Sequence, residues 1–190
     1  MTMRLVLFIL FFNFIIAKPI EYFVKIFNSG KYVKMEIDFS HKQYESNYNS
    51  NGVFFFIDKE RYVFDSSEFL LIVDDSISTT INHKTQQIIF SIIPNGQLNI
   101  FDILSGEYES IIFTKEEINN NSQNFYFKVR DFNYSGFVIV DLLSKNIRKI
   151  NLELDINQSI SVDIKSIELI ENYEVPKINN YKYEIIDLRG

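Results

Sequence analysis

The chain of 190 residues contains no cysteine. This absence excludes thiol nucleophiles, thiolate metal sites and redox motifs. Without disulfides the fold must be stabilised by its hydrophobic core alone, and a chain of this length is long enough to bury one of ordinary size. The apolar pattern therefore carries most of the structural information in this sequence.

Glycine, proline and histidine are also scarce, with six, three and two copies. The chain has no Gly-x-Ser-x-Gly elbow and no glycine-rich phosphate loop, which excludes two common kinds of catalytic or nucleotide site. His41 and His83 lie in polar segments without a second ligand at metal-binding spacing. We predict no metal site and no cofactor. Because no Pro- or Gly-rich linker divides the chain, we also predict a single domain.

Positive charge is limited: 19 Lys and Arg stand against 25 Asp and Glu, the net charge is -6, and no basic block occurs. Affinity for nucleic acid depends on basic side chains that neutralise phosphates, so nucleic acid is not an expected partner. Paired carboxylates occur at Asp74-Asp75 and Glu116-Glu117. Both pairs are expected at strand or loop ends, where acidic residues are common, so they give little support to a glycosidase. We predict that the protein is not an enzyme.

Residues 1–17 have the pattern of a secretory signal peptide. One basic residue, Arg4, precedes an apolar run from Leu5 to Ile16, and the small residue Ala17 follows the run. A membrane-spanning helix needs roughly 20 apolar residues, and this run is shorter, although an uncleaved anchor remains the alternative. We predict export with cleavage near Ala17 and a domain formed by residues 18–190.

Segment 19–29 has the pattern of an amphipathic helix. Pro19 suits the first helical turn, and Asn28-Ser29-Gly30 is a stop signal. We expect this helix to pack on a sheet and not at a membrane interface, because its polar face carries few basic residues. Its apolar face is formed by residues at i, i+3, i+4 and i+7, namely Ile20, Phe23, Val24 and Phe27.

The stretch from Gly52 to Asp75 predicts the centre of the fold. It contains three β-rich runs separated by short charged or serine breaks, as in a meander of antiparallel strands. A sheet with one solvated face would alternate apolar and polar residues, but these runs are apolar on both faces. We therefore expect these strands to be covered on both sides or to line an apolar cavity.

The rest of the chain also predicts mainly strands. A short helix is expected between Leu98 and Leu104, in the middle of this β-rich sequence. About ten strands with one helix before them and one among them predict a mainly β fold: a strongly curved antiparallel sheet or open barrel with helices over one mouth. The further strands are expected at 32–39, 77–81, 86–93, 108–113, 125–130, 137–142, 147–156 and 160–169, and loops at 46–51, 119–124 and 172–180.

Several short motifs of this chain occur in the order of a known family: Gly52-Val53-Phe54-Phe55-Phe56, Arg61-Tyr62-Val63-Phe64-Asp65, Leu71-Ile72-Val73-Asp74-Asp75, Gln87 to Ile89, Phe101 to Gly106, and Ile185 to Arg189. The first three resemble a Gly-x-φ-x-φ strand (φ being apolar), an aromatic strand, and a Val-x-Asp-Gly strand end with Asp75 in place of glycine. The last three resemble the strand that follows, a short helical insertion and a C-terminal strand. In this order they resemble the periplasmic lipoprotein carriers of the LolA type. The resemblance covers nearly all of the chain after the apolar N-terminal run and depends on order and spacing.

The resemblance implies an incomplete, open antiparallel β-barrel whose apolar concave face is covered by the N-terminal helix and a short helical lid. It implies a periplasmic carrier that shields the acyl chains of lipoproteins or lipids during transport from the inner to the outer membrane. The implied partners are the acylated cargo, an inner-membrane lipoprotein-releasing transporter and an outer-membrane acceptor, and the carrier is expected to be a monomer. The residues expected to line the cavity and lid are Phe54, Phe56, Tyr62, Phe64, Leu71, Val73, Ile89, Phe101 and Leu104.

One position departs from the family pattern. The family commonly has an Arg-Pro pair at the end of the second strand, where the Arg holds the lid shut, but this chain has Asp58 and Lys59. A latch through Lys59 or Arg61 is the expected replacement. The departure leaves glycolipids and fatty acids open as cargo beside lipoproteins. A lipid-sensing module of the same shape, a structural exported β-protein with a packed core, and an exported hydrolase are the other functions left open.

Overall fold

The computed structural model describes residues 26–27, 29–93, 100–104, 110–130, 132–178 and 180–190. The predicted signal peptide and most of the predicted first helix lie outside the described residues. Ile26 and Phe27, from the end of that predicted helix, are helical and pack against the core. In the described part of the chain, no helix has both the length and the apolar character needed to cross a membrane.

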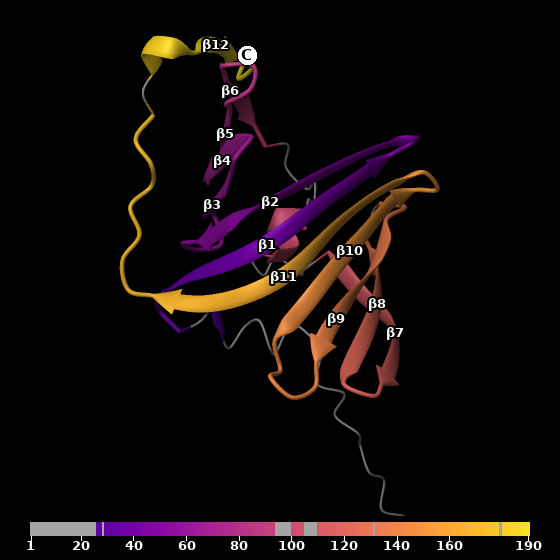
Figure 1. Ribbon diagram of the computed structural model, residues 1–190. Helices are drawn as coiled ribbons and strands as arrows, with labels where there is room; N and C mark the ends of the chain where they lie inside the picture. Colours follow the sequence, from indigo (N-terminus) through magenta and orange to yellow (C-terminus); the bar gives the residue numbers. More distant parts are fainter. Residues whose placement is uncertain (1–25, 28, 94–99, 105–109, 131, 179) are drawn as a thin grey trace, which may run out of the picture.

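Twelve strands of the described chain form one continuous sheet in the order β12-β6-β5-β4-β3-β2-β1-β11-β10-β9-β8-β7 (Figure 1). Every neighbouring pair is antiparallel except β12 and β6, which are parallel. The predicted mainly β, open fold is confirmed, with twelve strands where about ten were expected. The strands are β1 Tyr32–Gln43, β2 Ser46–Phe56, β3 Arg61–Ser66, β4 Phe69–Asp74, β5 Ile77–Asn82, β6 Gln87–Ile92, β7 Ile111–Asn119, β8 Ser122–Val129, β9 Ser135–Asp141, β10 Ile147–Asp155, β11 Gln158–Ile170 and β12 Glu184–Asp187.

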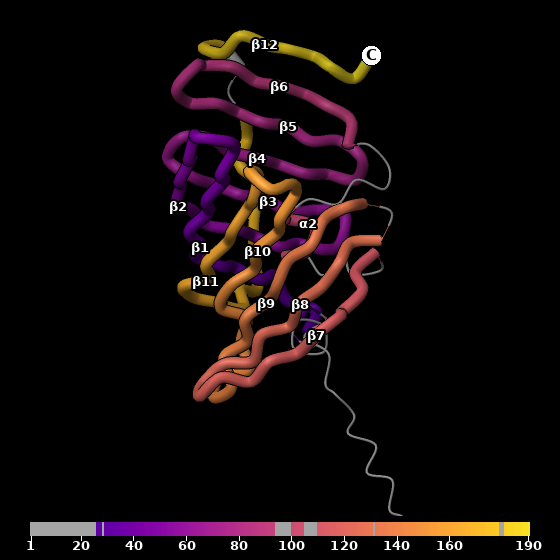
Figure 2. Tube along the Cα trace, turned by 90° about the vertical axis from the view of Figure 1, so that its right-hand side faces the viewer, coloured from indigo at the N-terminus to yellow at the C-terminus, as the bar shows by residue number. Residues whose placement is uncertain are grey.

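The sheet is strongly bent about its long central strands β1, β2 and β11 (Figures 1 and 2). Register shifts at Glu36/Ile37 in β1 and at Ile147/Lys149 in β10 interrupt the ladders, and such bulges increase the local twist. The bend creates a concave face, and the short helix α2 (Ile100–Leu104) lies against it between the two halves of the sheet (Figure 2). The predicted helix among the strands is therefore present.

The loop prediction at 46–51 was wrong, and the loop predicted at 119–124 is confined to residues 120–121, because β7 ends at Asn119 and β8 begins at Ser122. The polar residues 46–51 form the first half of β2, where Ser46 pairs with Gln43 and Asn51 with Asp38 of β1. Strand β7 continues to Asn119, so the pair Glu116-Glu117 lies within a strand and not at its end. Backbone pairing with a long neighbour holds these segments extended although their side chains are polar, and this contribution is not visible in local composition.

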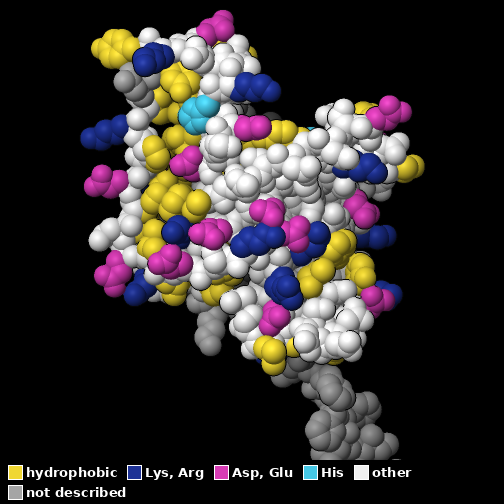
Figure 3. Space-filling view, in the orientation of Figure 1, with side chains coloured by type: hydrophobic (Ala, Val, Ile, Leu, Met, Phe, Trp, Pro, Cys, Tyr) yellow, Lys and Arg dark blue, Asp and Glu magenta, His cyan; other side chains and the backbone are white. Residues whose placement is uncertain are grey.

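The convex face of β3 to β6 carries a second apolar cluster formed by Val63, Leu70, Ile81 and Ile88. The irregular segment 171–178, followed by the 3-10 helix η1 (Asn180–Lys182), leads from β11 to β12 along this side of the molecule (Figures 1 and 3). Tyr173 stacks on Phe55 with ring centroids 4.1 Å apart, and its burial raises the pKa of Tyr173 to about 12. The predicted need for cover on both faces of the central strands is confirmed, and the C-terminal segment supplies the convex cover.

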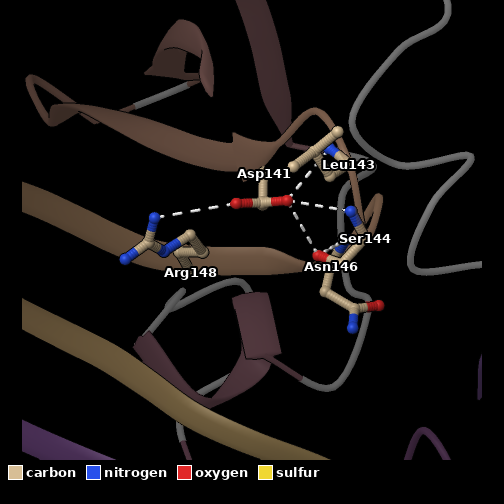
Figure 4. Close-up of polar contacts among 5 residues, drawn as sticks. All are labelled: Asp141, Leu143, Ser144, Asn146 and Arg148. Atoms are coloured by element: carbon tan, nitrogen blue, oxygen red, sulfur yellow. Dashed lines mark hydrogen bonds and ion pairs between the residues drawn. The ribbon is translucent and has the colours of Figure 1, made fainter. Parts of the chain in front are cut away.

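The turn between β9 and β10 is organised by one carboxylate (Figure 4). Asp141 Oδ1 accepts hydrogen bonds from the backbone N–H of Leu143 at 3.0 Å and of Ser144 at 2.8 Å. The other carboxylate oxygen lies 3.6 Å from Arg148 Nη1. The backbone N–H of Ser144 is the main interaction that lowers the pKa of Asp141 from its ordinary value.

Asp141→Ala should lower the melting temperature by a few degrees at neutral pH, because the turn loses its shared acceptor. Since the folded-state pKa is lowered, the stabilisation is complete above about pH 4 and disappears as the pH falls through the folded-state value. The difference in melting temperature between wild type and variant should therefore disappear in acid, as measured by thermal unfolding. Asp155→Ala removes the same charge from the neighbouring hairpin and controls for net charge. A gap that persists unchanged in acid would show that the carboxylate charge does not stabilise the turn.

Candidate functional site

The concave face carries one continuous apolar cluster to which β1 to β4, β7 to β11 and α2 all contribute. Its buried members are apolar side chains together with Tyr62. Each strand contributes alternate residues, because successive side chains point to opposite faces: Val33, Met35 and Ile37 from β1, and Phe125, Phe127 and Val129 from β8. The face is therefore apolar across both halves of the bent sheet.

Helix α2 fills the middle of this face. Four of its five side chains are buried, and only Asp102 is not. The Phe101 ring lies among aromatic rings from three strands. It is nearly parallel to Phe39, at 5.7 Å and 9°, and to Phe54, at 5.8 Å and 8°. The rings of Phe64 and Tyr62 lie 5.2 and 6.2 Å from it. Any ligand that enters the concave face at this point must displace Phe101.

Asp102 joins the helix to the sheet. The hydroxyl of Tyr62 on β3 donates a hydrogen bond to Asp102 Oδ1 at 3.2 Å. The phenol itself is buried in the concave cluster, with 2% of its surface exposed. This bond therefore fixes a polar atom of α2 to the same residue that supports the Phe101 ring.

The structure brings most of the sequence-predicted lining residues together. Leu71 is half-buried and packs against the cluster from β4. Ile89 is half-buried on the same face, since it follows Leu71 and Thr80 across β4, β5 and β6, but it lies outside the cluster. The buried members of the cluster are Phe54, Phe56, Tyr62, Phe64, Val73, Phe101 and Leu104.

The latch expected through Lys59 or Arg61 does not form between described residues. Lys59 is exposed. The Arg61 side chain donates to Asp58 Oδ2 at 2.7 Å from Nε and 2.5 Å from Nη2, within the β2–β3 turn. Both partners of this pair are about half exposed, so it stabilises the turn only weakly. Strand β3 is instead bonded to α2 through Tyr62 and Asp102.

The sequence prediction missed the aromatic residues of the other half of the face. The Phe113 ring contacts Phe125 and Phe127 with ring centroids 6.2 and 6.4 Å apart, in edge-on arrangements. Phe39 of β1 stacks on Phe101. The alternation of Phe125, Phe127 and Val129 along β8 was the available signal, since it indicates one buried face.

The described residues contain no group of three or more His, Cys, Asp or Glu side chains placed to hold a metal ion. His83 contacts the Tyr183 hydroxyl at 3.1 Å on the convex side, away from α2. The concave face thus offers apolar surface, aromatic rings and a hydrogen bond to the helix that fills it.

No protein-family model and no curated protein matches the chain. Among solved structures, an uncharacterized conserved protein from Thermus thermophilus is similar over 89% of this chain and 96% of its own, with a TM-score of 0.50 and 7% identity. This chain shares its fold. A LolA superfamily protein from Nitrosomonas europaea is a further structural neighbour, with a TM-score of 0.44 and 9% identity over 83% of this chain and 93% of that one. A putative outer membrane lipoprotein-sorting protein domain from Vibrio parahaemolyticus gives a TM-score of 0.44 and 9% identity, over 82% and 93% of the two chains.

Proposed function

We propose that this protein is a periplasmic carrier that shields the acyl chains of lipoproteins, or of other lipids, during transport from the inner to the outer membrane. The observation that best supports this function is a continuous apolar concave face covered in its middle by the five-residue helix α2. In this proposal α2 is the lid, and the acyl chain takes the place of its side chains. The acyl chain of the cargo would contact the lining residues Phe54, Phe56, Tyr62, Phe64, Leu71 and Val73, with Ile89 farther along the same face.

The free energy that holds α2 on the concave face is comparable to the free energy gained when an acyl chain is buried there. Burial of a Phe, Ile or Leu side chain contributes about 1.5–3 kcal/mol, so the four buried side chains of α2 hold it closed with roughly 6–12 kcal/mol before the entropy of ordering is subtracted. An acyl chain gains about 0.8 kcal/mol per buried methylene, or roughly 12 kcal/mol for a sixteen-carbon chain. An acyl chain can therefore replace the lid with a small net change in free energy, which a carrier needs for both loading and release.

The alternative is a structural exported β-protein, in which α2 is simply part of the core. The observation in its favour is that the side chains of α2 fill the concave face in this structure. The two functions differ in one measurable property, because only a carrier exchanges α2 for an acyl chain.

Native mass spectrometry of the protein isolated from the periplasm of its host tests the proposal. We expect a bound acylated lipoprotein or lipid, and we expect the emptied protein to bind a palmitoylated peptide but not the same peptide without its acyl chain. Leu71→Asn should weaken this binding at least tenfold, since it places an amide on the concave face.

Ile72→Asn is the matched control, because Ile72 is also half-buried but packs on the convex cluster. It should leave peptide binding unchanged. A protein isolated without lipid that also fails to take up the palmitoylated peptide would leave the structural protein as the better account.

Tyr62→Phe should raise the affinity for the palmitoylated peptide. The substitution removes the hydroxyl that donates to Asp102 and so destabilises the closed lid by about 1 kcal/mol, which corresponds to roughly fivefold tighter apparent binding. Fluorescence titration measures the change. Tyr126→Phe removes a hydroxyl from the convex face, where it donates to Glu117, and should have no effect. Equal affinities for wild type and Tyr62→Phe would show that this bond does not hold the lid.

A further inference from the structure

Strand β7, at one end of the sheet, places a carboxylate on the concave face. Glu116 pairs with Phe125 of β8, which is a buried member of the concave cluster. The flanking residues point to the opposite face. There Glu117 accepts a hydrogen bond from the Tyr126 hydroxyl at 2.9 Å, and the Lys115 ammonium lies 5.6 Å from the Tyr126 ring centroid. Glu117 also forms an ion pair with Lys115, whereas Glu116 lies beside the buried Phe125 ring.

One oxygen of the Glu116 carboxylate has no hydrogen-bond partner among the described residues. Its Oε1 accepts a bond from the side-chain amide of Gln123, whereas Oε2 is buried and receives no donor from the described part of the chain. A buried carboxylate oxygen without a donor is unfavourable, because it loses its hydration and gains nothing in exchange. This oxygen is therefore an acceptor that a ligand with a donor group could satisfy.

The carboxylate stands at the end of an apolar row. Glu116, Phe125, Val138 and Ile150 are consecutive cross-strand neighbours on β7, β8, β9 and β10. The last three are buried, and β10 contacts α2. A ligand whose tail lies where α2 now lies can therefore place its head group against Glu116, at the edge of the sheet.

We propose that Glu116 binds the head group of the cargo and selects acylated molecules whose head carries a protonated amine. This inference rests on the carrier function proposed above and specifies its ligand class. An ammonium donates to Oε2 in a charge-assisted bond, which is stronger than a bond from a neutral hydroxyl. A carboxylate head is disfavoured, because like charges in apolar surroundings repel.

Three probes with the same tail test the selection: dodecylamine, dodecanol and dodecanoate, each below its micellar concentration and at neutral pH. Their affinities follow from displacement of a neutral apolar fluorophore, N-phenyl-1-naphthylamine, from the whole protein. We expect wild type to bind dodecylamine about tenfold more tightly than dodecanol, and dodecanoate least tightly. Glu116→Gln should remove the preference for the amine.

Glu117→Gln is the matched control, since it removes the same charge one residue away on the opposite face. It should keep the preference for the amine, which separates a local contact from the attraction of an acidic protein for cations. Glu116→Gln should also raise the melting temperature of the ligand-free protein, because it removes a carboxylate charge whose Oε2 is buried without a donor among the described residues. A purely structural Glu116 would give the opposite change.

The outcomes separate the two proposals. Equal binding of the three probes, or an amine preference that survives Glu116→Gln, would overturn the selection by Glu116 and leave the carrier function standing. If none of the probes binds and the palmitoylated peptide does not bind either, the carrier function fails and the head-group selection fails with it.

Discussion

Phe101→Ala should destabilise the ligand-free protein by about 3 kcal/mol or more and at the same time strengthen the binding of an acylated ligand. The Phe101 ring is 8% exposed and lies between the rings of Phe39 and Phe54, so truncation leaves a cavity in the centre of the concave cluster. In the proposed mechanism the ring belongs to the closed lid and leaves the face when cargo enters. The substitution therefore destabilises the closed, ligand-free state more than it destabilises the complex with the acylated ligand.

Chemical denaturation with and without the palmitoylated peptide measures both effects. At a ligand concentration of about 100 times Kd, binding restores roughly 2.7 kcal/mol, so the loaded variant should recover most of the lost stability. Phe55→Ala is the control, since Phe55 stacks on Tyr173 of the convex face at 4.1 Å. It should lower stability without changing ligand affinity. A Phe101→Ala protein that binds the peptide more weakly than wild type would contradict the role of Phe101 as a displaceable lid.

The two-faced character of the central strands was predictable from their apolar runs. Phe54 and Phe56 share one face by alternation, and the neighbouring Phe55 and Val63 belong to the other. The identity of the convex cover was not predictable. Segment 171–178 has no regular period, and its contacts depend on isolated residues such as Tyr173 and Ile178. The role of those residues can be recognised only when the strands that they cover are in place.

Helix α2 could be predicted only in outline. The apolar pattern near Phe101 predicts a short helix, but the rings that surround it come from β1, β2 and β3, and only the folded sheet brings them together. The bond between Tyr62 and Asp102 joins residues 40 positions apart, so no local motif announces it. The guanidinium of Arg61, where a latch was expected, bonds to Asp58 in the same turn, a local contact that the family pattern did not indicate.

The face of the sheet on which Glu116 lies could not be predicted, because a β-bulge precedes it in β7. Strict alternation from Phe113 would place Lys115 on the concave face and Glu116 on the convex one. The register of β7 and β8 shifts between Phe113 and Lys115, so Lys115 pairs with Tyr126 and Glu116 with Phe125. One extra residue in a strand exchanges the faces of all that follow, and no feature of this sequence marks its position.

Gly136→Ala should destabilise the protein by about 3 kcal/mol, the upper end of the range for overpacking. A Cβ atom at this position would lie 2.1 Å from the backbone oxygen of Asn151 and 2.7 Å from the Phe127 ring, so β9 and β10 would have to separate and the ring would have to move. A glycine in a strand otherwise weakens it, and alanine would then be favourable. The sign of the measured change in unfolding free energy therefore shows which of the two effects is larger.

Gly30→Ala is the control for this prediction. Gly30 has a φ of 72° and nothing within 4 Å of an added Cβ, so alanine there meets only backbone strain of about 1 kcal/mol. In denaturant unfolding, the loss of stability caused by Gly136→Ala should be clearly larger than that caused by Gly30→Ala. It should also reduce peptide binding, because Phe127 belongs to the concave cluster and rests on the strand at Gly136. A Gly136→Ala protein as stable as wild type would mean that β9 and β10 can separate and Phe127 can move without loss of stability, and that the shape of the concave face does not depend on this glycine.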